Sequence, residues 1–162
     1  MAKIITGIGY EPDKLEGYSD QTLLRLTALA RATIVQLDAT EVITGVDLGW
    51  QQAIALAAIE LSLPLIAAIP IEEQDKLWNE QDRERWEIIL FQARRIIHVH
   101  RLPEYQAEDD ARTRKRNEWM IDNSNLVLAL EDDEASSILE YAESQGKAVF
   151  NVWKSWLKYG NS

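Results

Sequence analysis

Cysteine is absent from this chain of 162 residues. Without thiols the protein forms neither a disulfide nor a zinc–thiolate site, and a cysteine nucleophile is excluded as well. A long apolar run is also missing, because the longest, residues 53–70, is interrupted by Glu60, Ser62 and Pro64. The first residues lack the charged and apolar regions of a signal peptide. We therefore expect a cytoplasmic protein with no membrane partner.

Positive charge is scarce. The chain has 17 Lys and Arg against 27 Asp and Glu, a formal net charge of −10. Most of such a surface repels a phosphate backbone, so we expect no nucleic-acid partner. Basic residues cluster once, at Arg112, Arg114, Lys115 and Arg116. A solvated helix face is the commoner explanation of such a run.

Short apolar runs alternate with segments of helical periodicity along the whole chain. The expected strands cover residues 3–7, 41–44, 65–69, 95–100, 125–130 and 148–153. The expected helices cover residues 19–37, 50–61, 72–93 with a break near Glu80, 109–122 and 134–145. Four strands are continuous Ile/Val/Leu/Ala runs, which is typical of strands buried on both faces. The pattern predicts an α/β fold, a three-layer sandwich with a mainly parallel sheet flanked by helices.

Two glycine-containing turns each close an apolar run. They are residues 6–9, Thr-Gly-Ile-Gly, and residues 45–49, Gly-Val-Asp-Leu-Gly, followed by Trp50. Glycine lets a ligand approach the main chain, and a helix N-terminus favours an anion. We expect both turns at the carboxyl edge of the sheet, where α/β proteins bind ligands. Tight turns need glycine equally, and Asp47 is equally suited to cap the following helix.

Five fragments follow one another in a fixed order: Thr6-Gly7, residues 45–49, Pro70…Gln74…Trp78, Tyr105, and Arg116-Asn117-x-x-Met120-x-Asp122. In this order they resemble the YpsA-like branch of the SLOG superfamily, a Rossmann-like group that includes DprA and the LOG proteins. The resemblance covers nearly the whole chain. It implies a SLOG-like Rossmann domain over residues 1–154, with a C-terminal tail over 155–162, and a nucleotide or nucleotide-derived ligand.

Two departures from the family pattern bear on function. The family's opening Thr-Gly-His-Arg-Pro is Thr-Gly-Ile-Gly-Tyr at residues 6–10, and its Gly-Gly-Thr turn is replaced by the acidic stretch 131–137. Carboxylates at that place repel a phosphate. The LOG motif is missing too, so we expect a small-molecule binding protein without turnover. A nucleoside-phosphate hydrolase using Asp47, Glu131 or Asp133, and a protein-interaction module that has lost its ligand, stay open as alternatives.

The candidate ligand-binding residues come from these turns and fragments. They are Thr6, Gly7, Gly9, Gly45, Asp47, Gly49, Trp50, Arg116, Asn117 and Asp133. Arg116 is expected to hold a phosphate, and Trp50 or Trp78 to stack on a base.

Two further expectations concern metals and assembly. His98 and His100 lie two apart and face one side of an expected strand, but no third ligand is visible in the sequence, so we expect no metal site. We expect no other cofactor either. Apolar residues on the helices, including Trp86 and Phe91, point to a homodimer.

Overall fold

The computed structural model describes residues 2–15, 17–132 and 136–160. Its strands form one sheet in the order β4-β3-β2-β1-β5-β6. Their bounds are β1 Ile4–Gly9, β2 Glu41–Thr44, β3 Leu65–Ile69, β4 Arg95–His98, β5 Leu126–Leu130 and β6 Ala148–Asn151. Every neighbouring pair is parallel, which confirms the predicted α/β, Rossmann-like fold.

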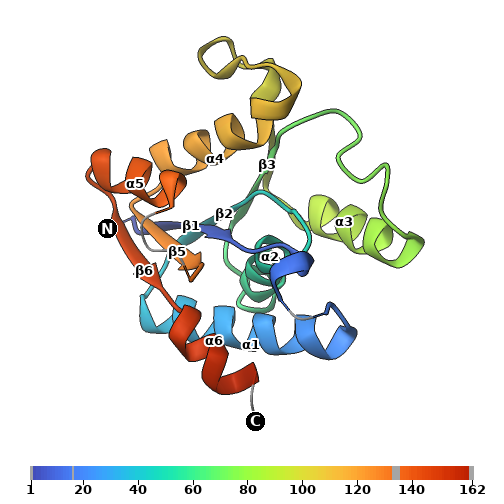
Figure 1. Ribbon diagram of the computed structural model, residues 1–162, viewed down its shortest axis with the longest axis vertical. Helices are drawn as coiled ribbons and strands as arrows, with labels where there is room; N and C mark the ends of the chain where they lie inside the picture. The colour runs from blue at the N-terminus through green and yellow to red at the C-terminus, as the bar shows by residue number, and fades with distance from the viewer. Residues whose placement is uncertain (1, 16, 133–135, 161–162) are drawn as a thin grey trace.

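Helices cover both faces of the sheet (Figure 1). Their bounds are α1 Asp20–Gln36, α2 Trp50–Glu60, α3 Glu80–Gln92, α4 Arg112–Asp122, α5 Ser137–Ser144 and α6 Trp153–Gly160. One core cluster joins the sheet to α1, α2, α3 and α6, and the other joins it to α4 and α5. Successive strand residues belong to different clusters, as Leu128 and Ala129 do, because their side chains point to opposite faces of the sheet.

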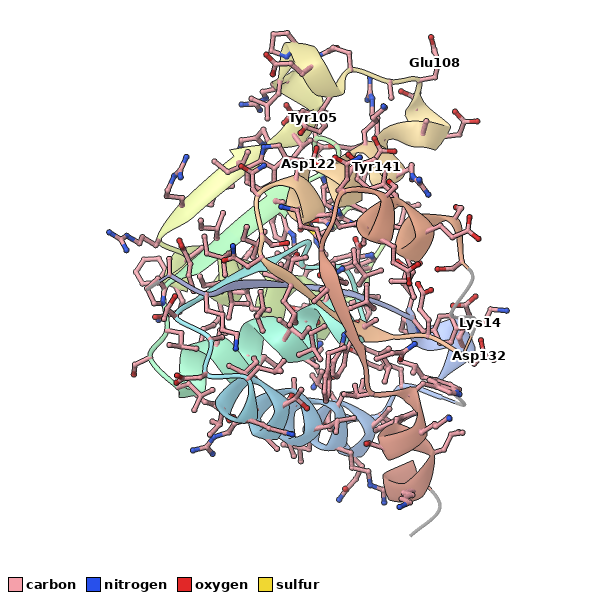
Figure 2. The ribbon with its side chains drawn as sticks, turned by 90° about the vertical axis from the view of Figure 1, so that its left-hand side faces the viewer. Lys14, Tyr105, Glu108, Asp122, Asp132 and Tyr141 are labelled. Atoms are coloured by element: carbon pink, nitrogen blue, oxygen red, sulfur yellow. The ribbon has the colours of Figure 1, made fainter. Side chains whose placement is uncertain are left out.

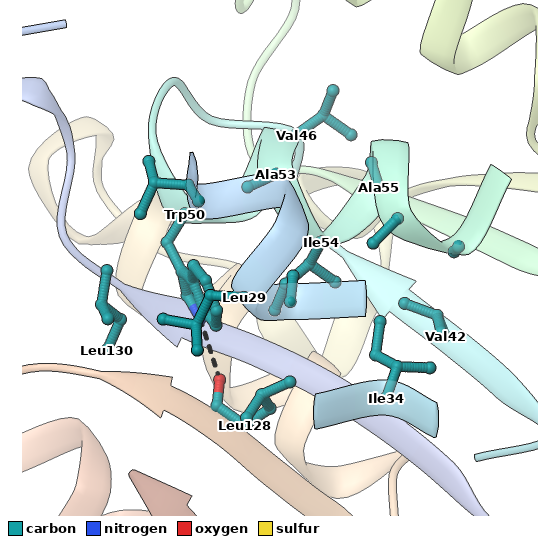
Figure 3. Packing of buried hydrophobic residues seen from close by; sticks show 14 of the residues in the cluster. Leu29, Ile34, Val42, Val46, Trp50, Ala53, Ile54, Ala55, Leu128 and Leu130 are labelled. Carbon is teal, nitrogen blue, oxygen red and sulfur yellow. Dashed lines mark hydrogen bonds between the residues drawn. The ribbon is translucent and has the colours of Figure 1, made fainter. Parts of the chain in front are cut away.

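Helix α2 is the most deeply buried of the helices in the first core cluster, which are α1, α2, α3 and α6. Its side chains from Trp50 to Ala55 are all buried, and Ile54 packs directly on β1. A Cβ at Gly7 would lie 2.2 Å from Ile54 Cδ1. Glycine at this position therefore permits close helix–sheet packing, and Figure 3 shows Ile54 and Trp50 pointing into that core.

Helix α1 begins where the sequence predicts. The Ser19 side chain accepts a hydrogen bond from the Thr22 amide, and the Thr22 hydroxyl accepts one from the Ser19 amide. This reciprocal cap satisfies two of the helix's free amides.

The predicted helix over residues 72–93 is wrong in its first half. The helix begins only at Glu80, because Asn79 caps it by accepting from the Asp82 amide. Residues before it form turns, and Glu73 has a left-handed φ of 51°, which no helix accommodates.

Other predicted boundaries shift by a few residues. β1 continues to Gly9, so the residues predicted as a glycine turn, 6–9, are part of the strand and pair with β5. β4 ends at His98 and a 3₁₀ turn, Val99–Arg101, follows. β6 ends at Asn151, whose Oδ1 accepts from the Trp153 amide as α6 begins. Helix α6 crosses the expected domain boundary after residue 154, and its Trp156 is buried in the first core cluster. The expected helix start at residue 134 lies outside the described residues.

Candidate functional site

The loops after β1, β2 and β5 meet where the strand order reverses direction. From β1 the chain proceeds through β2 and β3 to β4 on one side, whereas β5 and β6 lie on the other side. The crevice outside such a switch point is the usual ligand site of open α/β sheets. Tyr10 connects the loops: its amide donates to Leu130 O and its carbonyl accepts from the Trp50 amide, each at 3.2 Å.

Tyr10 also reaches the loop after β5. Its hydroxyl donates to the Asp132 carboxylate and accepts from the Asp132 amide at 3.2 Å. The Tyr10 ring stands edge-on to Trp153 of α6, with centroids 5.3 Å apart. Tyr10 therefore holds the two loops that flank the switch point, although the sequence patterns did not identify it.

A buried ion pair between Arg116 of α4 and Asp47 lies at the carboxyl ends of β2 and β3. Arg116 has no exposed surface. Its Nη1 donates to Gly45 O at 2.8 Å and Ala68 O at 3.4 Å, and its Nε donates to Asn117 Oδ1 at 2.9 Å. All three guanidinium nitrogens thus bond to the protein. The expected role of Arg116 as a phosphate ligand therefore gives way to that of a group fixing two strand ends.

Gln74 holds the other side of the same carboxylate. Its Nε2 donates to Asp47 Oδ1 at 2.6 Å and to Gly45 O at 2.9 Å, while its Oε1 accepts from Trp86 Nε1 at 2.9 Å. Both Asp47 oxygens are thereby fixed in direction, since Arg116 Nη2 bonds to Oδ2. The Asp47 side chain is still 16 % exposed. The result is a pre-oriented hydrogen-bond acceptor at the carboxyl edge.

Three of the predicted glycines leave room for the protein's own atoms. A Cβ at Gly45 would lie 2.5 Å from the Arg116 guanidinium, and one at Gly9 would lie 2.4 Å from Trp50 Cδ1. Gly49 has a φ of 93° and would place a Cβ 2.5 Å from Tyr10 O. Side-chain and loop packing therefore explains these glycines.

Trp50 and Thr6 belong to the interior. Trp50 has no exposed surface and its indole Nε1 donates to Leu128 O at 3.1 Å (Figure 3). The expectation that Trp50 stacks on a base is therefore corrected, because neither ring face reaches solvent. Thr6 is equally buried and donates to Ile43 O at 3.0 Å. Asp133 lies outside the described residues.

Amides of the β2–α2 turn are likewise bonded within the protein. The Gly45 amide donates to Gln51 Oε1 at 2.8 Å, and the Gly49 amide to the Tyr18 hydroxyl at 3.1 Å. The Trp50 amide donates to Tyr10 O. These three donors are occupied, so they do not form the anion cradle that the glycine pattern suggests.

Carboxylates dominate the electrostatics of this edge. The pKa of Glu11, two residues after β1, is raised by partial desolvation and by the negative charges of Asp47 and Asp13, with Arg116 acting in the opposite direction. Asp132 lies across the switch point. Glu11 belongs to no recognisable motif, so sequence reasoning missed it. The arrangement favours a neutral, donor-rich group over an anion.

The exposed members of the basic cluster on α4 form ion pairs with nearby acids. Arg114 and Lys115 both pair with Glu118, at 2.9 and 3.2 Å, and Arg112 pairs with Asp109 at 3.2 Å. Apart from buried Arg116, the run is a helix surface with intrahelical and local ion pairs.

Tyr105 and Asp122 form a separate clamp, together with Tyr141 of α5 (Figure 2). The Tyr105 hydroxyl donates to Asp122 Oδ2 at 2.5 Å and the Tyr141 hydroxyl to Oδ1 at 2.6 Å. Burial and these hydrogen bonds raise the pKa of both phenols. The clamp ties the segment before α4 to α4 and α5, which gives both family-motif residues a structural role.

Comparison with known proteins agrees with this fold. A family described as the YspA SLOG family matches residues 18–151. The SPbeta prophage-derived protein YoqJ of Bacillus subtilis is 32 % identical over 141 residues, which cover 75 % of this chain and 82 % of YoqJ. Within the described residues, no helix is long and apolar enough to cross a membrane.

Three solved structures share the architecture at low identity. DprA from Helicobacter pylori has a TM-score of 0.59 at 16 % identity, covering 99 % of this chain and 74 % of that one. The molybdenum cofactor carrier protein from Chlamydomonas reinhardtii has a TM-score of 0.56 at 15 % identity, covering 97 % and 82 %. The chain spans half the length of DprA from Streptococcus pneumoniae (TM-score 0.61, 17 % identity, 93 % of this chain).

The exclusion of nucleic acid on the basis of net charge is wrong. DprA from Helicobacter pylori, which has this fold, is described as binding single-stranded DNA. A net charge of −10 averages over the whole surface, whereas binding depends on local charge and shape.

Proposed function

Because this chain belongs to the YspA SLOG family, we propose that it binds a nucleotide-derived small molecule at the switch point, without turning it over. The observation that carries the proposal is the pre-oriented carboxylate of Asp47, held by Arg116 and Gln74 and still partly exposed. An acceptor fixed before the ligand arrives loses little conformational entropy on binding.

The acidic surroundings select which part of such a ligand faces Asp47. Glu11, Asp47 and Asp132 line the loops, so a phosphate is repelled, whereas sugar hydroxyls or an exocyclic amine donate to carboxylates. In this arrangement Arg116 acts as a positioning residue. The ligand is therefore recognised mainly through its nucleoside part.

The similar structures support binding as the common activity. One is described as a carrier of the molybdenum cofactor and another as a binder of single-stranded DNA. Neither description requires chemistry on the ligand. Their low identity transfers no ligand to this chain, so the ligand class rests on the carboxylate geometry.

Calorimetry with a panel of nucleosides, their 5′-monophosphates and a short single-stranded oligonucleotide tests the proposal. We expect a nucleoside to bind at least as well as its monophosphate. Asp47→Asn should weaken binding about ten- to a hundredfold, since a charge-assisted hydrogen bond contributes roughly 1.5–3 kcal/mol. Asp38→Asn is the control, because Asp38 precedes β2 at the amino edge of the sheet.

Three outcomes contradict the proposal. The first is no binding of any panel member at millimolar concentration, which favours the interaction module. The second is tighter binding of the oligonucleotide than of every mononucleoside, which favours a nucleic-acid partner. The third is equal binding by wild type and Asp47→Asn. If Asp47→Asn fails to fold, Asp132→Asn on the other side of the switch point replaces it.

A hydrolase is the second candidate, and the environment of Glu11 favours it. The pKa of Glu11 is raised, whereas the nearby Asp47 is ion-paired with Arg116. In many hydrolases one carboxyl group with a raised pKa acts as the general acid and a second carboxylate stays ionised. Release of free base from a nucleoside monophosphate, measured by chromatography and abolished in Glu11→Gln, would establish turnover. A nucleotide that stays intact after prolonged incubation would show that the protein does not hydrolyse it.

A further inference from the structure

A second polar cluster lies at the same carboxyl edge, beyond the Asp47 site. One ligand atom each from Glu72, His98 and His100 lie within 4.8 Å of one another. His98 ends β4 and pairs with Ile69, the last residue of β3. Glu72 follows β3 by three residues, and His100 lies in the 3₁₀ turn after β4. Two neighbouring strands therefore deliver three metal-ligating side chains to one place.

His100 has the orientation of a metal-binding histidine. Its Nε2 lies 3.0 Å from Glu72 Oε1, and its Nδ1 lies 3.5 Å from Ile69 O. A backbone carbonyl beside one ring nitrogen is a typical second partner of a metal-binding histidine, and the other nitrogen faces the cluster. The side chain is only 8 % exposed, so the ring is held in place by its surroundings.

His98 carries an unsatisfied atom. Its Nδ1 is buried and has no hydrogen-bond partner among the described residues. Such an atom costs about 1–3 kcal/mol, so an unpaired one in a native fold calls for an explanation. The His98 ring stands edge-on to His100, with centroids 5.8 Å apart. Coordination of a cation by His98 Nδ1 would supply the missing partner.

Two imidazoles and one carboxylate form a recognised donor set. Zn²⁺ accepts nitrogen and oxygen ligands, and sites with three protein ligands keep a position open for water or another molecule. Mg²⁺ and Ca²⁺ prefer oxygen ligands throughout. We propose that Glu72, His98 and His100 bind a divalent first-row transition-metal ion, of which Zn²⁺ is the representative.

Arg101 competes with the ion for Glu72. Its Nε donates to Glu72 Oε1 at 2.8 Å, and its Nη2 contacts the same oxygen. Both side chains are more than half exposed, at 56 % and 61 %, so Arg101 can move into solvent when the ion enters. Removal of the Arg101 side chain should therefore strengthen metal binding. A cluster that serves only to stabilise the fold predicts no such gain.

Titration of the metal-free chain with Zn²⁺ tests the site, with calorimetry and the visible absorption of Co²⁺ as two readouts. We expect one ion per chain and an increase in melting temperature. Glu72→Gln and His100→Gln should each weaken metal binding at least about tenfold, because even the loss of a residue that only supports a ligand costs about 10- to 100-fold in affinity. Arg101→Gln should strengthen it. Glu73→Gln, an exposed neighbour, is the matched control and should bind as wild type does.

Two results would overturn the site: no saturable Zn²⁺ binding, or binding that Glu72→Gln and His100→Gln leave unchanged. If His100→Gln does not fold, Glu72→Gln remains decisive, because Glu72 is exposed. Nucleoside binding at Asp47 is measured separately, so failure of either site leaves the other testable.

Discussion

Two polar clusters occupy the carboxyl ends of neighbouring strands, and they differ in how fully their polar atoms are bonded. Around Arg116 every guanidinium nitrogen bonds to the protein. Around His98 a buried ring nitrogen has no partner among the described residues. A fully bonded cluster fixes the backbone and orients Asp47. A cluster with an unsatisfied buried atom is where an external ligand gains most.

The largest expected loss of stability comes from removing Arg116 from its fully bonded cluster. Arg116→Ala leaves Asp47 without its ion-pair partner and removes the guanidinium hydrogen bonds to Gly45 O and Ala68 O. Breaking a buried pair costs about 3–5 kcal/mol, so the urea midpoint should fall sharply.

Arg112→Ala is the control for that measurement. Its partner Asp109 is 91 % exposed, so the loss should stay below about 1 kcal/mol. Equal stability of the two variants would show that the Arg116 cluster does not hold the strand ends together.

A glycine substitution separates packing from chemistry in the same cluster. Gly45→Ala places a methyl group 2.5 Å from the Arg116 guanidinium and should cost about 1–3 kcal/mol by overpacking. In the Arg116→Ala background the obstacle is gone, so the same change should cost much less. A double-mutant cycle in urea measures this coupling, and simple additivity would count against the packing role of Gly45.

The Tyr105–Asp122–Tyr141 clamp is a second fully bonded cluster, and it predicts a pH dependence. Both phenol pKa values are raised in the folded state, so the stability from these hydroxyls is complete below the ordinary tyrosine pKa of about 10. It is lost as the pH rises above that value through the folded pKa. Denaturation at a series of alkaline pH values should show the decline.

Tyr141→Phe sharpens that test. It should lower stability by about 1–3 kcal/mol near neutral pH, since it removes a hydrogen bond to a carboxylate. It should also reduce the alkaline decline. An unchanged alkaline profile would show that other groups cause it.

The smallest effect on stability is expected at the exposed apolar surface of α3. Phe91 is 87 % exposed and Ile88 59 %, and Ile96 of the edge strand β4 is 41 % exposed. We expect this surface to mediate the predicted homodimer. Phe91→Glu should leave the melting temperature nearly unchanged and shift light scattering from dimer to monomer. A wild-type monomer at micromolar concentration would refute the assembly.

The strands were predictable because burial on both faces leaves a continuous apolar run, as in Leu65–Ile69. The helix over residues 72–93 was predicted correctly from its expected break near Glu80 onward, but not before it. Periodicity does not register the left-handed φ of Glu73, which keeps the earlier residues out of a helix.

The candidate site was predicted in position but not in detail. The glycine turn after β2 lies at the carboxyl edge, but the one predicted over residues 6–9 is part of β1. Trp50 is buried because its indole reaches β5, an element far away in sequence. The third ligand of the histidine cluster was missed for the same reason. Glu72 joins His98 only through the pairing of β3 with β4, which no local pattern reveals.

The contrast between the fully bonded Arg116 cluster and the His98 cluster is tested most directly by nitrogen-15 NMR of the side chains during a Zn²⁺ titration. The chain has only two histidines, so their ring nitrogens are readily assigned, and the Arg116 Nε resonance reports on the bonded cluster in the same spectrum. We predict that one equivalent of Zn²⁺ shifts the ring nitrogens of His98 and His100 and leaves Arg116 unchanged. Histidine resonances that do not respond to Zn²⁺ would contradict the account.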